Sequence, residues 1–279
     1  MQAAARTGTV QYEQSEPIIG FRKCAASPDA QYFYARPSAP VRNTPVLVSV
    51  HGISRNAREQ ARAFAQCCTS LGWVVVAPFF PRDRFPKYQQ PGTSKKQNYP
   101  RSDLILNAIL DEVADLMGAA TERVYMFGYS GGGQFVHRYA FLHPERVIAA
   151  ALGAPGWYTF PDWKSPFPRG LRAGAGKAGL SFDRDEVLRV PIAVFVGAQD
   201  LDRDKSLNRS PKIDGQQGRT RVERARRWIA AMQNAARTGG FNTRYEFREL
   251  EGCGHSFTEC VRAGQMDAKA IEFLNGPHD

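Results

Sequence analysis

The sequence predicts an α/β fold, with a mostly parallel central sheet of about eight strands and helices on both of its faces. Two observations lead to this prediction. Short apolar runs rich in Val and Ile recur along the chain with little alternation, which is typical of strands covered on both faces. Amphipathic stretches of helical length separate the runs, and such alternation favours parallel pairing.

The expected strands fall into two groups. The N-terminal stretch is less regular and holds three possible antiparallel strands: Val10–Gln14, Phe21–Cys24 and Tyr32–Arg36. The apolar runs that follow are Val46–Val50, Trp73–Ala77, Val124–Tyr129, Val147–Leu152, Ile192–Val196 and Tyr245–Leu250. We expect these runs to form the parallel part of the sheet.

The helices expected between the strands are Ala57–Leu71, Ser102–Met117, Gly131–His143, Thr220–Ala236 and Val261–Leu274. Ser102 and Asp103 are candidate caps for the second helix. His143-Pro144 should end the third, because proline cannot continue a helix.

No repeat or linker divides the chain, so we expect one domain over residues 1–279, with N-terminal strands in residues 1–44. No inserted cap domain is evident. Two long segments rich in Pro or Gly, residues 78–100 and 154–181, follow strands directly. In open α/β sheets ligands bind beyond the carboxyl ends of the strands, so these loops should wall a pocket.

Composition narrows the class of protein. A hydrophobic fraction of 43% suffices for a large core, and 37 basic against 27 acidic residues give a net charge of +10. Without a motif that reads RNA or DNA, this charge is most simply a matter of solubility, and we expect no nucleic-acid partner. The oligomeric state stays open.

The chain as it stands indicates a soluble, cytoplasmic protein with no membrane partner. No apolar run approaches the ~18 residues that a spanning helix needs, and the opening MQAAARTGTV has no apolar signal core. A secreted or periplasmic location follows instead if a signal peptide has been removed.

Five cysteines leave at least one unpaired within a monomer. Cys253 and Cys260 flank His255 and could close a small loop, although reduced thiols are the commoner state in the cytoplasm. No CxxC pair or HExxH motif is present, so we expect no metal and no cofactor.

The most informative stretch is Gly128-Tyr129-Ser130-Gly131-Gly132, which matches G-x-S-x-G. It ends an expected strand and opens an expected helix, the context that a nucleophilic serine on a sharp turn requires. The flanking glycines let neighbouring backbone approach, and the helix N-terminus favours developing negative charge. Ser130 is therefore the candidate nucleophile.

A serine nucleophile needs a base and an acid. His255 follows the last expected strand on a glycine-rich loop, whereas the other histidines lie on helices, in the tail or in the His51-Gly52 turn. Asp200 directly follows the strand Ile192–Val196 and could orient the histidine. Asp202 and Asp204 are its rivals, and we favour Asp200 because it lies nearest the strand end.

The backbone amides of Ile53 and Gly131 are the candidate oxyanion hole, since Ile53 follows the first parallel strand and Gly131 follows the nucleophile. We expect His51 to be a structural hydrogen-bonding residue rather than a second base.

Taken together, the HG turn, the G-x-S-x-G elbow, the G-x-x-D turn and the G-x-G-H loop make residues 45–274 resemble the α/β-hydrolase superfamily. Within it, the chain is similar to bacterial carboxylesterases and the poly(hydroxyalkanoate)-depolymerase or feruloyl-esterase-like group. Dienelactone-hydrolase-like and prolyl-peptidase-like enzymes are neighbours. The chain departs from the lipase-type HGGG pattern, which argues against a lipase for bulky esters.

This resemblance implies a serine carboxylesterase that acts through an acyl-enzyme on small or polymeric esters, including polyester or aromatic esters. Amide, peptide or urethane hydrolysis by the same triad is the alternative, and a non-catalytic binding protein is a further one. Tyr129, Trp157 and Tyr158 are candidate substrate-binding residues, although Trp157 and Tyr158 could equally pack their loop onto the body. The basic run Arg219, Arg221, Arg224, Arg226 and Arg227 is interpreted as a solvated helix face.

Overall fold

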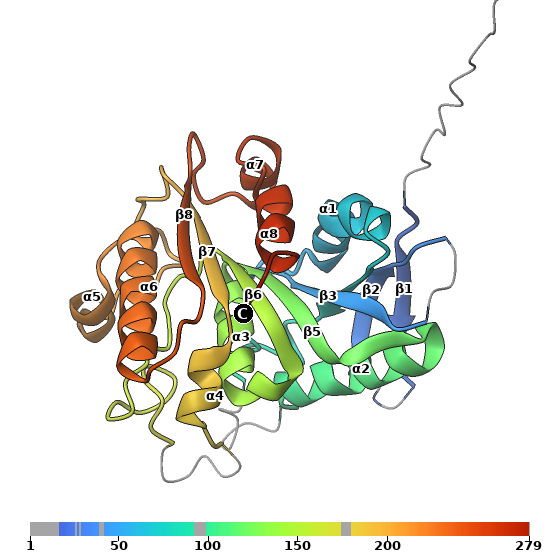
Figure 1. The fold of residues 1–279 in the computed structure, drawn as a ribbon. Coiled ribbons are helices and arrows are strands. Elements are labelled where there is room, and N and C mark those ends of the chain that lie inside the picture. The colour runs from blue at the N-terminus through green and yellow to red at the C-terminus, as the bar shows by residue number, and fades with distance from the viewer. Residues whose placement is uncertain are drawn as a thin grey trace, which may run out of the picture.

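The structure is a computed structural model that describes residues 17–25, 27, 29–38, 42–91, 99–173 and 180–278. Its centre is an eight-stranded sheet with the order β1-β2-β4-β3-β5-β6-β7-β8 (Figure 1). The fold class expected from the sequence is therefore confirmed. The possible strand Val10–Gln14 lies outside the described residues.

The strands are β1 (Gly20–Lys23), β2 (Gln31–Ala35), β3 (Thr44–Val50), β4 (Val74–Phe79), β5 (Ala119–Tyr129), β6 (Val147–Gly153), β7 (Ile192–Gly197) and β8 (Tyr245–Leu250). β3 to β8 pair in parallel, whereas β1 and β2 are antiparallel to their neighbours. Every residue of β7 is buried, as expected for a strand with helices on both sides.

The helices are α1 (Ala57–Ser70), α2 (Ser102–Met117), α3 (Gly131–Leu142), α4 (Arg184–Arg189), α5 (Pro211–Gln217), α6 (Arg221–Thr238), α7 (Phe257–Arg262) and α8 (Met266–Leu274), with a 3-10 turn at Pro144–Arg146. α1 and α8 contact each other on one face of the sheet, and α2, α3 and α4 lie on the other (Figure 1). The short helices α4 and α5 were not expected from the sequence.

Two expectations about helices are wrong. The single helix Val261–Leu274 is two helices, because the chain turns at Gly264 and Gln265, which has a φ of 50°. The close contact of Gly264 with the Cys260 carbonyl and the Cys253 sulfur leaves no room for a side chain there.

At the start of α2, neither candidate cap acts as one, since no side chain caps this helix. The hydroxyl of Ser102 donates to the Tyr88 carbonyl at 2.9 Å. Asp103 is buried and pairs with Arg101 and His143. Both side chains therefore tie α2 to other elements rather than to its own amides.

The turn between α2 and β5 is short. Between α2 and β5 the chain turns on Gly118, whose φ of 62° suits glycine at a helix C-terminus. A Cβ at Gly118 would have no atom within 4 Å. This turn is open and lies at the end of β5 opposite to Ser130, which follows Tyr129.

Candidate active site

Ser130 occupies a strained turn between β5 and α3. Its φ of 52° and ψ of −110° lie in a region that L-residues rarely adopt. The Ser130 amide donates to the Gly153 carbonyl at 2.6 Å, which fixes the turn to β6. A Cβ on Gly132 would overlap the Val50 carbonyl of β3, so only glycine permits this approach.

The structure brings Ser130, His255 and Asp200 together from three separate parts of the chain. His255 Nε2 lies 3.1 Å from Ser130 Oγ, and His255 Nδ1 lies 2.6 Å from Asp200 Oδ2. The histidine side chain is 20% exposed, whereas the carboxylate is fully buried. The three groups form one hydrogen-bonded relay that ends at the serine oxygen.

Backbone contacts set the position of Asp200 at the end of β7. The Gln199 amide donates to the Cys253 carbonyl at 2.9 Å, which ties this turn to the loop that carries His255. The rivals do not reach the histidine: Asp202 is exposed, and Asp204 pairs with Arg221. Of the three candidate acids, the structure places only Asp200 against the imidazole.

The amides of Ile53 and Gly131 lie next to each other beside Ser130. A Cβ built on Gly131 would lie 3.4 Å from the Ile53 nitrogen. Within the described part of the chain, neither amide donates to a backbone carbonyl. The two N–H groups are thus available to an oxygen at this point, as an oxyanion hole requires.

His51 is a structural residue, as the sequence indicates. The Phe80 amide donates to its Nε2 at 3.1 Å, so Nδ1 carries the proton and donates to the Gly52 carbonyl at 2.8 Å. Complete burial, with a smaller contribution from the charge of Arg55, lowers the pKa of His51 to about 3. This imidazole stays neutral and holds the HG turn against the end of β4.

Of the three aromatic candidates, Tyr129 is the one whose ring contacts His255. Its ring stacks on His255 with 5.4 Å between ring centroids. Trp157 covers the guanidinium of Arg138 instead, and Tyr158 is fully buried against Trp228. For Tyr158 the structure therefore supports the packing interpretation rather than a pocket wall.

The basic run of α6 is not a solvated face throughout, and that expectation is wrong for two of its members. Arg221 and Arg224 are buried, whereas Arg219, Arg226 and Arg227 are exposed. Arg221 and Arg224 lie seven and four residues before Trp228, on the same face of the helix. This spacing is the signal in the sequence that could have identified them.

The remaining expectations concern the cysteines, metal binding and the membrane. Cys253 and Cys260 are free thiols, and both are buried. In the described ranges no group of three or more His, Cys, Asp or Glu residues could hold a metal. No helix of the described residues is long and apolar enough to cross a membrane.

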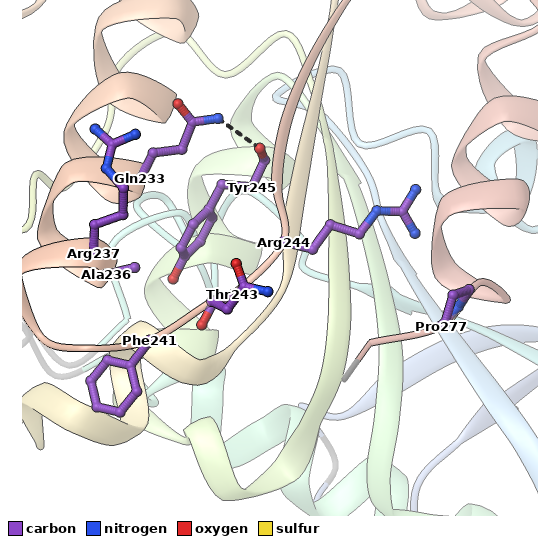
Figure 2. A pocket seen from close by; sticks show the side chains of 9 residues that line it. Gln233, Ala236, Arg237, Phe241, Thr243, Arg244, Tyr245 and Pro277 are labelled. Atoms are coloured by element: carbon purple, nitrogen blue, oxygen red, sulfur yellow. Dashed lines mark hydrogen bonds between the residues drawn. The ribbon is translucent and has the colours of Figure 1, made fainter.

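A surface pocket of about 600 Å³ lies elsewhere, between the end of α6, the start of β8 and Pro277. Figure 2 shows Gln233 donating to the Tyr245 carbonyl across its wall. Neither Ser130, Asp200 nor His255 lines this pocket. It is therefore separate from the triad.

Comparison with solved structures gives the same fold at low sequence identity. A poly(aspartic acid) hydrolase-1 from Sphingomonas sp. KT-1 superposes with a TM-score of 0.78 at 23% identity, over 94% of this chain and 100% of that one. LpqC, a poly(3-hydroxybutyrate) depolymerase from Bordetella parapertussis, has a TM-score of 0.73 at 24% identity, over 94% of this chain and 91% of that one.

An S-formylglutathione hydrolase from Agrobacterium tumefaciens follows with a TM-score of 0.60 at 15% identity, over 92% of this chain and 94% of that one. Neither the protein-family models nor the curated proteins gave a match. At these identities the similarity shows a shared fold and no more.

Proposed function

From the premise that this chain has the α/β-hydrolase fold, we propose that it is a serine hydrolase that cleaves carboxylic esters through an acyl-enzyme. The observation that carries the proposal is the relay from buried Asp200 through His255 to Ser130. Such a relay can remove the serine proton at neutral pH, which an isolated serine cannot lose.

In the first half of the reaction, Ser130 Oγ attacks the ester carbonyl while His255 Nε2 takes the hydroxyl proton. Asp200 keeps Nδ1 protonated and stabilises the imidazolium. The carbonyl oxygen gains negative charge and lies between the amides of Ile53 and Gly131. Collapse of this intermediate breaks the bond to the alcohol, which leaves with the proton from His255.

In the second half, water replaces the alcohol. His255 takes a proton from the water, the resulting hydroxide attacks the acyl carbon, and the same two amides bind the oxyanion. The bond to Ser130 Oγ then breaks, and the imidazolium returns its proton to the serine. A free carboxylic acid leaves and the triad is restored.

Amide hydrolysis is a second candidate because the poly(aspartic acid) hydrolase superposes with a TM-score of 0.78. Poly(aspartic acid) is a polyanion held together by amide bonds, and the net charge of +10 on this chain would favour its approach. The triad chemistry is the same, with an amine rather than an alcohol as the leaving group.

The test is hydrolysis of p-nitrophenyl esters from acetate to decanoate, run beside poly(aspartic acid) with release of amines as the readout. Turnover of the esters that is lost in Ser130→Ala would support the esterase, and the chain-length profile would size the acyl pocket. Turnover of the polymer alone would favour the amide hydrolase. If a phosphonate probe failed to label Ser130 and nothing were hydrolysed, both proposals would be wrong.

A further inference from the structure

The carboxylate of Asp200 is held from two sides. Its Oδ2 faces His255, and its Oδ1 accepts a hydrogen bond of 3.0 Å from Arg221 Nη1. Both side chains of this ion pair are almost completely buried, at 0% and 1% exposure. Removing Arg221 would therefore leave the buried carboxylate without its cation.

Arg221 also fixes the loop that follows Asp200. Its Nη2 donates to Ser206 Oγ at 2.7 Å and to Asp204 Oδ2 at 3.2 Å. Its Nε has no partner, so the contacts are all made by the two terminal nitrogens. The guanidinium links the carboxylate of the triad to the 200–206 loop.

The place of Arg221 in α6 is unfavourable for a cation. It is the first residue of the helix after the cap Thr220, where the helix dipole favours negative charge. Nothing in helix propensity accounts for a buried arginine at this position. The contacts with Asp200, Asp204 and Ser206 offset the cost, which indicates that the position is used to hold the acid.

On the basis of the proposed function, we propose that Arg221 is a positioning residue that fixes the orientation of Asp200 against His255. It occupies Oδ1, so that Oδ2 remains directed at His255.

Among the described residues, two side chains hydrogen-bond the Asp200 carboxylate, Arg221 of α6 and His255 of the β8–α7 loop. Tyr129 of β5, Cys260 of α7 and Tyr158 of the loop after β6 lie near enough to interact with its charge. Burial raises the pKa values of Tyr129, Tyr158 and Cys260, the last to about 12. Arg221 is thus the permanent cation of this set.

The test compares kcat and KM at neutral pH for wild type, Arg221→Gln and Arg221→Lys. For Arg221→Gln we expect kcat to fall roughly ten- to a hundredfold, the range found for partners that orient metal-binding histidines. KM should stay within about twofold of wild type, because Arg221 acts through Asp200 rather than on the substrate. Arg221→Lys keeps a donor and a positive charge beside Asp200, so part of kcat should return.

The matched control is Arg224→Gln. Arg224 is also buried in α6, but it pairs with Asp214 and the Gly156 carbonyl rather than with Asp200. Both Gln variants should lose stability to a similar extent, whereas only Arg221→Gln should lower kcat by this factor. An equal loss of kcat in Arg224→Gln would overturn the specific role of Arg221.

Should Arg221→Gln fail to fold, Ser206→Ala removes one contact of the guanidinium at the edge of the cluster. It should lower kcat/KM about two- to fivefold, the equivalent of one net hydrogen bond, and unchanged kinetics would overturn the proposal. Phosphonate labelling of Ser130 separates the proposed function from the role of Arg221. If wild type is not labelled, the proposed function fails; if it is labelled and Arg221→Gln matches its kcat, only the role of Arg221 is overturned.

Discussion

The surroundings of His51 and His137 differ from those of His255. His51 and His137 are fully buried, and each ring is fixed between two backbone groups. His255 instead contacts a carboxylate and a hydroxyl, and its side chain is 20% exposed. Proton transfer requires partners whose charge can change and a path to solvent, so the surroundings of His255 suit such a transfer and those of His51 and His137 do not.

The largest loss of activity is expected on removal of Ser130 Oγ, the oxygen that His255 Nε2 contacts. Ser130→Ala removes the proposed nucleophile, and kcat should fall by a factor of about 10⁶, the loss found when the serine of a Ser-His-Asp triad is removed. The measurement is steady-state ester hydrolysis with thermal unfolding as a control for folding. Substantial remaining activity would mean that the relay from His255 serves a different nucleophile.

His255→Ala should reduce kcat nearly as much as Ser130→Ala, because the triad acts as a unit. The double variant should be little worse than either single one. His278→Gln is the control, since among the described residues its imidazole contacts the Leu274 carbonyl and the Phe273 ring and none of Ser130, Asp200 and His255. If His255→Ala retained wild-type activity, the distinction between the two histidine environments would have no functional meaning.

Asp200→Asn should cost about four orders of magnitude in kcat, because an amide can hold the histidine in the wrong tautomer. Asp202→Asn, which changes an exposed side chain two residues away, should stay within about twofold, as surface substitutions usually do. The measurement is kcat for ester hydrolysis by the two variants. The opposite ranking would transfer the role of the acid to Asp202.

The smallest expected effect concerns His51, one of the two fully buried histidines. It appears in the free energy of unfolding. Burial lowers the pKa of His51 to about 3, below the value of about 6.5 in the unfolded chain. Between these values the unfolded state binds a proton that the folded state does not, so stability is lost as pH falls below about 6.5. His51 alone should contribute about 2 kcal/mol of that loss between pH 7.5 and pH 5.

Urea unfolding of wild type and His51→Gln at both pH values measures this contribution. The variant should be less stable at pH 7.5, because the Phe80 amide and the Gly52 carbonyl lose a fitted partner. It should lose less stability than wild type on acidification. Equal losses in the two proteins would show that His51 does not titrate on unfolding in this range.

The sheet was predictable because its signal is local. Buried parallel strands such as β4 and β7 appear as apolar runs, and α2 was expected with the same bounds that the structure has. The break between α7 and α8 was not expected, because it depends on the contact of Gly264 with Cys260 and Cys253 rather than on a proline. Helix patterns carry no signal of such tertiary contacts.

For the candidate site, the strand-end positions of Ser130, Asp200 and His255 sufficed to predict that they meet. Arg221 was missed because a basic run is ordinarily solvated, and its burial depends on a carboxylate 21 residues earlier in the chain. The sequence left two interpretations for Tyr158, substrate binding or packing of its loop, because it does not show which side of the loop faces Trp228.

The open turn at Gly118 bears on how this molecule could be handled. The turn lies at the end of β5 opposite to Ser130, and a Cβ at Gly118 would meet no atom within 4 Å. A cysteine in place of Gly118, at a cost of about 1–2 kcal/mol for the positive φ, would anchor the protein to a bead by the end of the sheet away from Ser130. The triad would then point into the surrounding liquid, where a suspended polymer particle could reach it. Coupling through random lysines would lose that common orientation.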